Sequence, residues 1–220
     1  MKEENKNGQL PEKEQLLSSL RNAEEMYVFM SLCTKMPYVL CDEETFDDEV
    51  LLYYTEEDAQ REGKKLIEQR IPIQIAKIEK KQLLGFFSSL YPMGVNGLLI
   101  NKNMESEARL QLGELVIRPN TEDLPDGKVW VENPQLHLTA LYFMQEMRRQ
   151  EKPELTEELK GLQEEILVNY GRGRFIVAVH KENGMPMLKQ KNGDAYQPIF
   201  TDILEFRKFN KEDQFKTMAI

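Results

Sequence analysis

Residues 26–37, Met-Tyr-Val-Phe-Met-Ser-Leu-Cys-Thr-Lys-Met-Pro, decide how this chain folds. The mostly apolar run 26–32 contains aromatic and β-branched side chains and is typical of a buried strand. A second apolar run begins at Met36 and continues to Cys41, which predicts another strand directly after the first. Two strands this close in the sequence favour a sheet, and the surrounding segments are interpreted relative to it.

Helix and strand signals surround this pair. Before it, residues 12–25 carry leucines at helical spacing, behind a polar stretch, 1–11, that we expect to be a frayed tail. After an acidic turn, residues 50–54 predict a strand, and Thr55 with the three acids behind it is typical of a helix start. We expect that helix to reach about residue 69. Beyond it we expect a strand at 71–75, with Pro72 favouring a sheet edge, an apolar helix at 82–90, and strands at 98–101 and 115–117.

The middle of the chain lacks these short strands. Residues 119–133 are rich in turn-forming residues and predict a linker. Asn133-Pro134 then predicts the start of a helix that reaches about residue 147. Pro153 begins a second helix, which Gly171 ends, and each helix carries one apolar stripe that we interpret as core packing.

An internal repeat is predicted because 26–37 aligns without a gap with residues 175–186, Phe-Ile-Val-Ala-Val-His-Lys-Glu-Asn-Gly-Met-Pro. After a slip of a few residues, the aromatic-Thr-acid junction at Thr55 also aligns with the one at Thr201. We therefore expect Thr55 and Thr201 at equivalent helix starts. Further strands are expected at 175–179, 185–188 and 195–200, with Asn192-Gly193 as a hairpin turn.

These signals together predict an α/β fold of the α+β type, with two related small sheet-plus-helix units joined by a helical segment. The first unit with its tail spans 1–118, the linker and helical pair span 119–170, and a second, incomplete unit spans 171–220. The second unit lacks a counterpart of 82–101, which would leave apolar surface beside the strand 215–220 uncovered. We expect either a chain shortened relative to its gene or a second subunit that fills the gap.

An ordered set of motifs between residues 26 and 101 resembles the SseB N-terminal domain family, named for enhanced serine sensitivity. The motifs are Tyr54-Thr55-Glu56, the strand 71–78, the helix 82–90, and Gly94 followed by Gly97-Leu98-Leu99-Ile100-Asn101. Residues from Phe175 onward look like a second, incomplete copy. The resemblance implies no established activity and places no catalytic residue on this chain.

Composition limits the classes of partner. The net charge is −9 and the basic residues are scattered, so a phosphate backbone would repel the chain and nucleic acid is excluded as a partner. The first residues lack the apolar stretch of a signal peptide, and no apolar run reaches the ~18 residues of a membrane span. We therefore expect a cytoplasmic protein without a membrane partner, in which Cys33 and Cys41 are reduced and buried, although a disulfide between them stays open.

No residue pattern predicts a catalytic, cofactor or metal site. His137, His180, Cys33 and Cys41 lack the paired spacing of metal ligands, and Cys33 with His180 lacks any nucleophile signature. We interpret the acidic run 42–49 as a solvated turn, because it lacks the glycine and the alternating carboxylates of a calcium loop.

Gly171-Arg172-Gly173 follows a helix and precedes a strand, which is the reverse of a phosphate loop, so we interpret it as a helix stop.

The expected function is therefore a non-catalytic protein-binding or scaffolding module, whose partner is another protein or its own copy. The alternative is a module that binds a small metabolite, such as an amino acid, between its two units. A hydrolase comes third.

Overall fold

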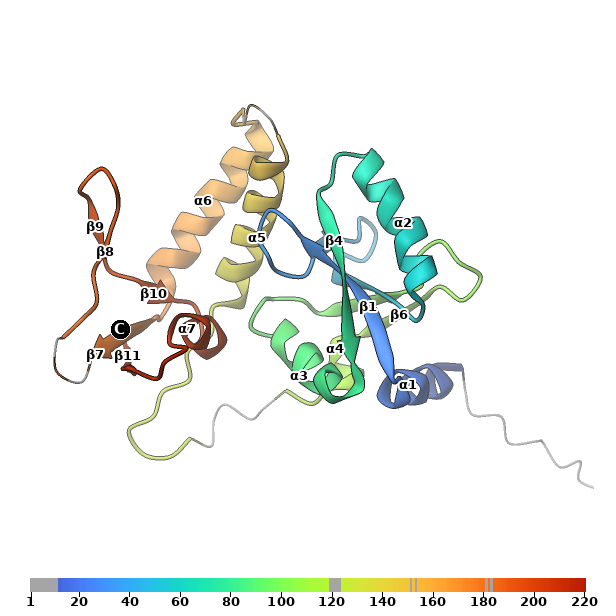
Figure 1. The fold of residues 1–220 in the computed structure, drawn as a ribbon, viewed down its shortest axis with the longest axis horizontal. Helices are drawn as coiled ribbons and strands as arrows, with labels where there is room; N and C mark the ends of the chain where they lie inside the picture. Colours follow the sequence, from blue (N-terminus) through green and yellow to red (C-terminus); the bar gives the residue numbers. More distant parts are fainter. Residues whose placement is uncertain (1–11, 119–123, 151, 153, 181, 183) are drawn as a thin grey trace, which may run out of the picture.

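The computed structural model describes residues 12–118, 124–150, 152, 154–180, 182 and 184–220. The expected tail at 1–11, Pro119 and Pro153 lie outside these residues. Two main sheets carry their own helices, with a helix pair between them (Figure 1), and the predicted mixed α/β class is confirmed. The elements are α1 (Glu12–Asn22), β1 (Glu25–Ser31), β2 (Val39–Cys41), β3 (Asp48–Tyr53), α2 (Glu56–Glu68), β4 (Ile73–Glu79), α3 (Lys80–Leu90), β5 (Gly97–Ile100), β6 (Ala108–Gln111), α4 (Leu112–Leu115), α5 (Pro134–Arg149), α6 (Glu157–Arg172), β7 (Ile176–His180), β8 (Leu188–Lys189), β9 (Ala195–Tyr196), β10 (Ile199–Phe200), α7 (Ile203–Phe209) and β11 (Phe215–Ala219).

The larger sheet has the strand order β4-β1-β3-β5-β6, and β2 pairs with the part of β3 that β1 leaves free. β3 and β5 run parallel, whereas the other neighbouring strands of this sheet pair antiparallel. β4 lies at the sheet edge, where the preceding Pro72 predicted it.

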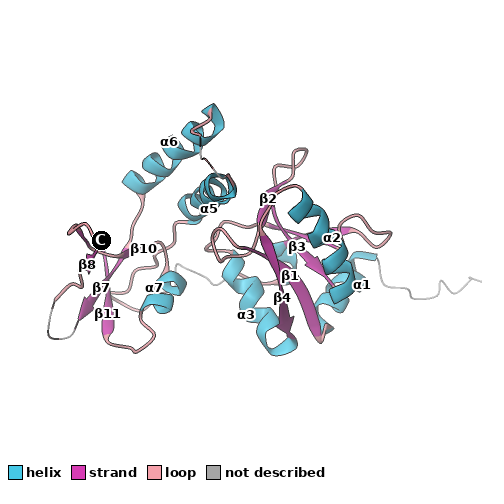
Figure 2. Cartoon of the chain, turned by 45° about the horizontal axis from the view of Figure 1, so that its top comes forward, coloured by secondary structure: helices cyan, strands magenta, loops and turns pink. Residues whose placement is uncertain are grey.

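β1 is buried on both faces of this sheet, as its continuous apolar run predicted. Met26 and Val28 belong to the core that α1 and α3 cover, whereas Tyr27 and Phe29 belong to the core beneath α2. Figure 2 shows α2 and α3 on opposite sides of the sheet. The Thr55 side chain caps α2 by accepting the Asp58 N–H at 3.2 Å, which confirms the predicted helix start.

One strand of the first unit was predicted in the wrong place. The expected strand 115–117 is not formed, because the preceding residues form the short helix α4, in which Leu112 is fully buried. The carbonyl of Val116 accepts the Tyr91 hydroxyl at 2.6 Å instead of a strand partner. The strand at the edge opposite β4 is β6, in which only Leu110 is buried. Its polar composition is why the sequence did not predict this strand.

The helix pair differs from expectation at its boundaries and in the apolar stripe of α6, of which only Leu159 is buried, so the expected core packing is wrong for most of that stripe. α6 begins at the Thr156 cap, which accepts the Leu159 N–H at 3.2 Å, so the helix starts later in the chain than expected, and Pro153 itself lies outside the described residues. The helix continues through Gly171 and ends at Gly173, whose N–H donates to the Tyr170 carbonyl. The glycine-containing segment is therefore a helix stop, two residues later than expected.

α5 packs on the first unit. Leu138 and Leu141 are part of the core beneath α1 and α3. The Tyr142 hydroxyl donates to an Asp48 carboxylate oxygen at 2.6 Å, and the Gln145 amide bonds both backbone groups of Val39. These contacts hold α5 against the first unit, and the rest of the chain continues from this helix.

The smaller sheet has the order β10-β7-β11, with β7 antiparallel to both neighbours, and α7 connects β10 to β11. The same order and sense relate β3, β1 and β4, with α2 as the connection. Asn192-Gly193 lies in the turn of the β8–β9 hairpin, as predicted.

The strand register corrects the predicted role of Thr201. Tyr53 pairs with Tyr27, and Phe200 pairs with Ile176, so counting two residues onward makes Asp202 the counterpart of Thr55. The Asp202 side chain caps α7 by accepting the N–H groups of Leu204 and Glu205. Thr201 precedes the cap, so its predicted place at the helix start is wrong, while the repeat itself stays a prediction.

Candidate functional site

A pocket of about 340 Å³ lies where α7 faces the first unit. Its walls come mainly from β1, β4, α3 and the turn after β1, and they include Val28, Met30, Met36, Ile78, Phe86 and Met93. Pockets of roughly 300–1,000 Å³ with apolar walls and a few polar groups are typical of small-molecule sites. The walls of this pocket are therefore mostly apolar, and the groups that could bind a polar ligand lie at one end.

Three polar side chains from two helices meet at that end. His137 lies in the first turn of α5, whereas Asp202 and Glu205 lie at the start of α7. His137 is 9% exposed and Asp202 is 1% exposed. The His137 Nδ1 atom lies 3.5 Å from Asp202 Oδ2 and has no hydrogen-bond partner in the described part of the chain.

The polar groups around Asp202 favour its ionised form. Burial alone would raise the pKa of Asp202, but the neighbouring His137, the Glu205 N–H and the Thr201 hydroxyl together lower this pKa below its usual value. Glu205 Oε1 accepts a hydrogen bond from the Lys208 ammonium, and the same ammonium lies 3.0 Å from Met36 Sδ. The pocket end therefore combines a fixed buried carboxylate, a second carboxylate and an imidazole.

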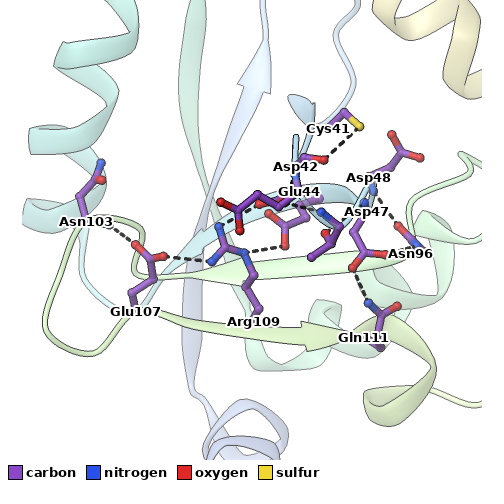
Figure 3. Close-up of polar contacts among 12 residues, drawn as sticks. Cys41, Asp42, Glu44, Asp47, Asp48, Asn96, Asn103, Glu107, Arg109 and Gln111 are labelled. Atoms are coloured by element: carbon purple, nitrogen blue, oxygen red, sulfur yellow. Dashed lines mark hydrogen bonds and ion pairs between the residues drawn. The ribbon is translucent and has the colours of Figure 1, made fainter.

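The acidic run 42–49 forms a second polar cluster, around Arg109 of β6 (Figure 3). The guanidinium lies 3.1 Å from an Asp42 carboxylate oxygen and 3.3 Å from Glu49 Oε1. Residues 43–46 are exposed, as expected for a solvated turn. The expectation is wrong for Glu49, which is 1% exposed because it lies within β3 beneath Arg109.

Glu49 is ionisable, buried and incompletely bonded. Burial raises the pKa of Glu49 above its usual value, although Arg109 opposes this rise. Its Oε2 atom is buried and has no hydrogen-bond partner among the described residues. This network already satisfies Arg109, and we assign it a structural role.

We expect Glu49→Gln to have the stability of the wild type near about pH 4 and to exceed it by about 1 kcal/mol near about pH 7. The raised pKa means that the folded state binds the Glu49 proton more tightly than the unfolded chain does. The wild type therefore loses stability as the pH rises above the unfolded glutamate pKa of ~4.3. Urea denaturation at a series of pH values measures the difference.

Glu107→Gln is the matched control for that series. Glu107 lies 3.4 Å from the same guanidinium but its side chain is 31% exposed, so its removal should cost less than about 1 kcal/mol at every pH. A difference between Glu49→Gln and the wild type that stays constant with pH would contradict the prediction.

An open strand edge forms a third feature. β11 pairs with β7 and lies at the edge of the smaller sheet. The reciprocal hydrogen bonds between Phe175 and Ile220, at 3.0 and 2.9 Å, fix the alternation of backbone groups along β11. The N–H and C=O groups of Thr217 and Ala219 therefore point away from the sheet.

Comparison with known proteins gives little. No family model matches the chain, and no curated protein matches it. A solved structure described as Tic22 from Plasmodium falciparum aligns with 93% of this chain and 82% of its own, at 15% identity and a TM-score of 0.25. A likeness this weak carries no argument about function.

The remaining predicted groups lie apart. Cys33 is buried and Cys41 is exposed at the end of β2, and both are free thiols, so the expectation of two buried thiols is wrong for Cys41. Cys33 lines a pocket of about 430 Å³ between β2 and the helix pair, and His180 is not part of that lining. His180 stacks edge-on against Phe215 at the end of β7.

No described helix combines the length and apolarity that a membrane crossing requires.

Proposed function

We propose that this chain is a non-catalytic scaffolding protein that binds a second copy of itself through the free edge of β11. The observation that carries this proposal is the outward direction of the Thr217 and Ala219 backbone groups at an open sheet edge. Unpaired strand edges are templates for pairing with another chain, since each added strand satisfies backbone groups that otherwise bind water.

Self-pairing fits the side chains of this strand. Antiparallel pairing centred on Thr217 places Lys216 opposite Met218 of the other copy, so no like charges face each other. Met218 and Ile220 are 40% and 58% exposed, and both lie on the same face of β11 as Lys216. In this register the Met218 side chains of the two copies are diagonal neighbours on that face, whereas Ile220 lies opposite Gln214.

Thr217→Pro tests the proposal, with Thr217→Val as its matched control. Proline removes an N–H that faces away from β7, so it spares the sheet but blocks strand addition. We expect analytical ultracentrifugation to show a wild-type dimer, a dimer in Thr217→Val, and a dissociation constant raised at least about tenfold in Thr217→Pro. A monomeric wild type, or a Thr217→Pro dimer of unchanged affinity, would contradict self-pairing.

We also propose a cytoplasmic location, membership of the SseB N-terminal domain family, and an internal repeat relating the two units. The equivalent register of β1 with β3 and of β7 with β10 supports the repeat. The motifs between residues 26 and 101 support the family, and the absence of nucleic-acid or membrane signals in the sequence supports the location.

A second candidate function is the binding of a small metabolite in the pocket between α7 and the first unit. The volume of about 340 Å³ and the mixture of apolar walls with His137 and Asp202 favour it. A thermal-shift screen of amino acids distinguishes the candidates, because a ligand in this pocket would raise the melting temperature without changing the oligomeric state.

A further inference from the structure

Three side chains of metal-ligand type converge at the polar end of the pocket. Among the described residues, His137, Asp202 and Glu205 each offer one ligand atom, and these atoms all lie within 4.8 Å of one another. The imidazole comes from α5, which packs on the first unit, and both carboxylates come from the cap and first turn of α7. The cluster therefore joins the two halves of the molecule.

The unbonded nitrogen of His137 is an independent sign of a missing partner. Nδ1 is buried, the residue is 9% exposed, and this atom makes no hydrogen bond to a described group, its nearest charged neighbour being Asp202 Oδ2 at 3.5 Å. Buried polar atoms almost always have a partner, so an exception points to a bound water or ion. This nitrogen faces Asp202, which is the most deeply buried carboxylate of the cluster.

The distance between these two groups fits chelation better than a hydrogen bond. His137 Nδ1 and Asp202 Oδ2 lie 3.5 Å apart, at the outer limit of hydrogen bonding. Two ligands of a tetrahedral zinc ion, with bonds of ~2.1 Å, lie about 3.4 Å from each other. Asp202 caps α7 through Oδ1, while Oδ2 accepts the Thr201 hydroxyl at 2.8 Å and faces His137.

We propose that His137, Asp202 and Glu205 bind a divalent transition-metal ion of the zinc class. One imidazole nitrogen with two carboxylate oxygens is a donor set that suits zinc, and three protein ligands leave one coordination position for a water or for a pocket ligand. The Lys208 contact uses Oε1 of Glu205, and metal binding would displace this ammonium or use the other oxygen. The bound ion would connect α5 to α7 and so fix the second unit against the first.

A titration of the full chain with cobalt(II) alone tests this site, after a chelator has removed bound metal. We expect one absorbing site per chain, from which zinc(II) displaces cobalt(II). His137→Gln should weaken cobalt binding by at least about 100-fold, since even the loss of an outer-shell partner costs roughly 10–100-fold. His180→Gln changes the other histidine of the chain, outside the cluster, and should bind like the wild type.

No saturable cobalt binding, or equal binding by His137→Gln and the wild type, would overturn the site. If circular dichroism shows that His137→Gln does not fold, Glu205→Gln tests the site instead. Glu205 is only half-buried and lies within α7, so its replacement should leave the fold intact. We expect this variant to keep the wild-type spectrum and to bind cobalt at least about tenfold more weakly. Unchanged affinity in Glu205→Gln would overturn the site as well. This metal site does not depend on β11, so its failure would leave the self-pairing proposal intact.

Discussion

Gly94→Ala is expected to destabilise the protein by several kcal/mol. Gly94 has a φ of +87°, and an added Cβ would lie 2.6 Å from the Pro134 carbonyl oxygen and 2.9 Å from Leu138 Cβ. The left-handed backbone costs about 1–2 kcal/mol for a residue with a side chain. The contact adds about 1–3 kcal/mol, because it meets the backbone of α5 and can be relieved only by moving that helix.

Gly127→Ala separates these two contributions. Gly127 has a φ of +79°, but nothing lies within 4 Å of its added Cβ, so only the backbone cost applies. Urea denaturation of both variants measures the free energy of unfolding, and Gly94→Ala should lose clearly more of it. Equal losses in the two variants would mean that α5 does not pack closely on the loop at Gly94.

Asn133→Ala is expected to loosen the second unit from α5 and to cost about 2–4 kcal/mol of stability. The Asn133 amide nitrogen donates to the carbonyls of Arg174 and Thr201, at 2.5 and 2.9 Å. Asn133 is buried, so its removal leaves two carbonyls without their donor. Hydrogen exchange should report the change as faster exchange in β7 and β10, with β1 unaffected.

Asn22→Ala is the control for this prediction. Asn22 donates to the Ser18 carbonyl at 2.8 Å within the exposed end of α1, where water replaces the lost hydrogen bond. This variant should lose less than about 1 kcal/mol. Uniformly faster exchange in both sheets of Asn133→Ala would show that the residue serves global stability rather than the attachment of the second unit.

Much of the fold could be predicted because local sequence and tertiary packing agree there. The apolar residues of β1 and the Thr55 cap have one strong local preference each, and the structure follows both. β6 was missed because an edge strand with one buried residue has almost no hydrophobic pattern. At Thr201-Asp202 two adjacent residues can both cap a helix, and only the pairing of Phe200 with Ile176 selects Asp202.

The polar end of the pocket could not be predicted from the sequence. His137 and Asp202 are far apart in the chain, and each has an ordinary local explanation, as a residue of a helical first turn and as a helix cap. Their proximity depends on how α5 packs on the first unit and how α7 packs on β10 and β7, which no spacing encodes. The Glu49 burial was missed for a related reason, since the charge run looked uniform while its last two residues lie within β3.

The parallel pairing of β3 with β5 has a consequence for synthesis of the chain on the ribosome. α2, β4 and α3 lie between these strands in the sequence, so one side of β3 has no neighbour until residue 100 has been translated. At ~5–20 residues per second this interval lasts roughly 2–10 s. Val50 and Leu52, which are fully buried in the finished fold, are incompletely covered on the nascent chain during this time. Until β5 is available, the central strand β3 can therefore pair on one side only.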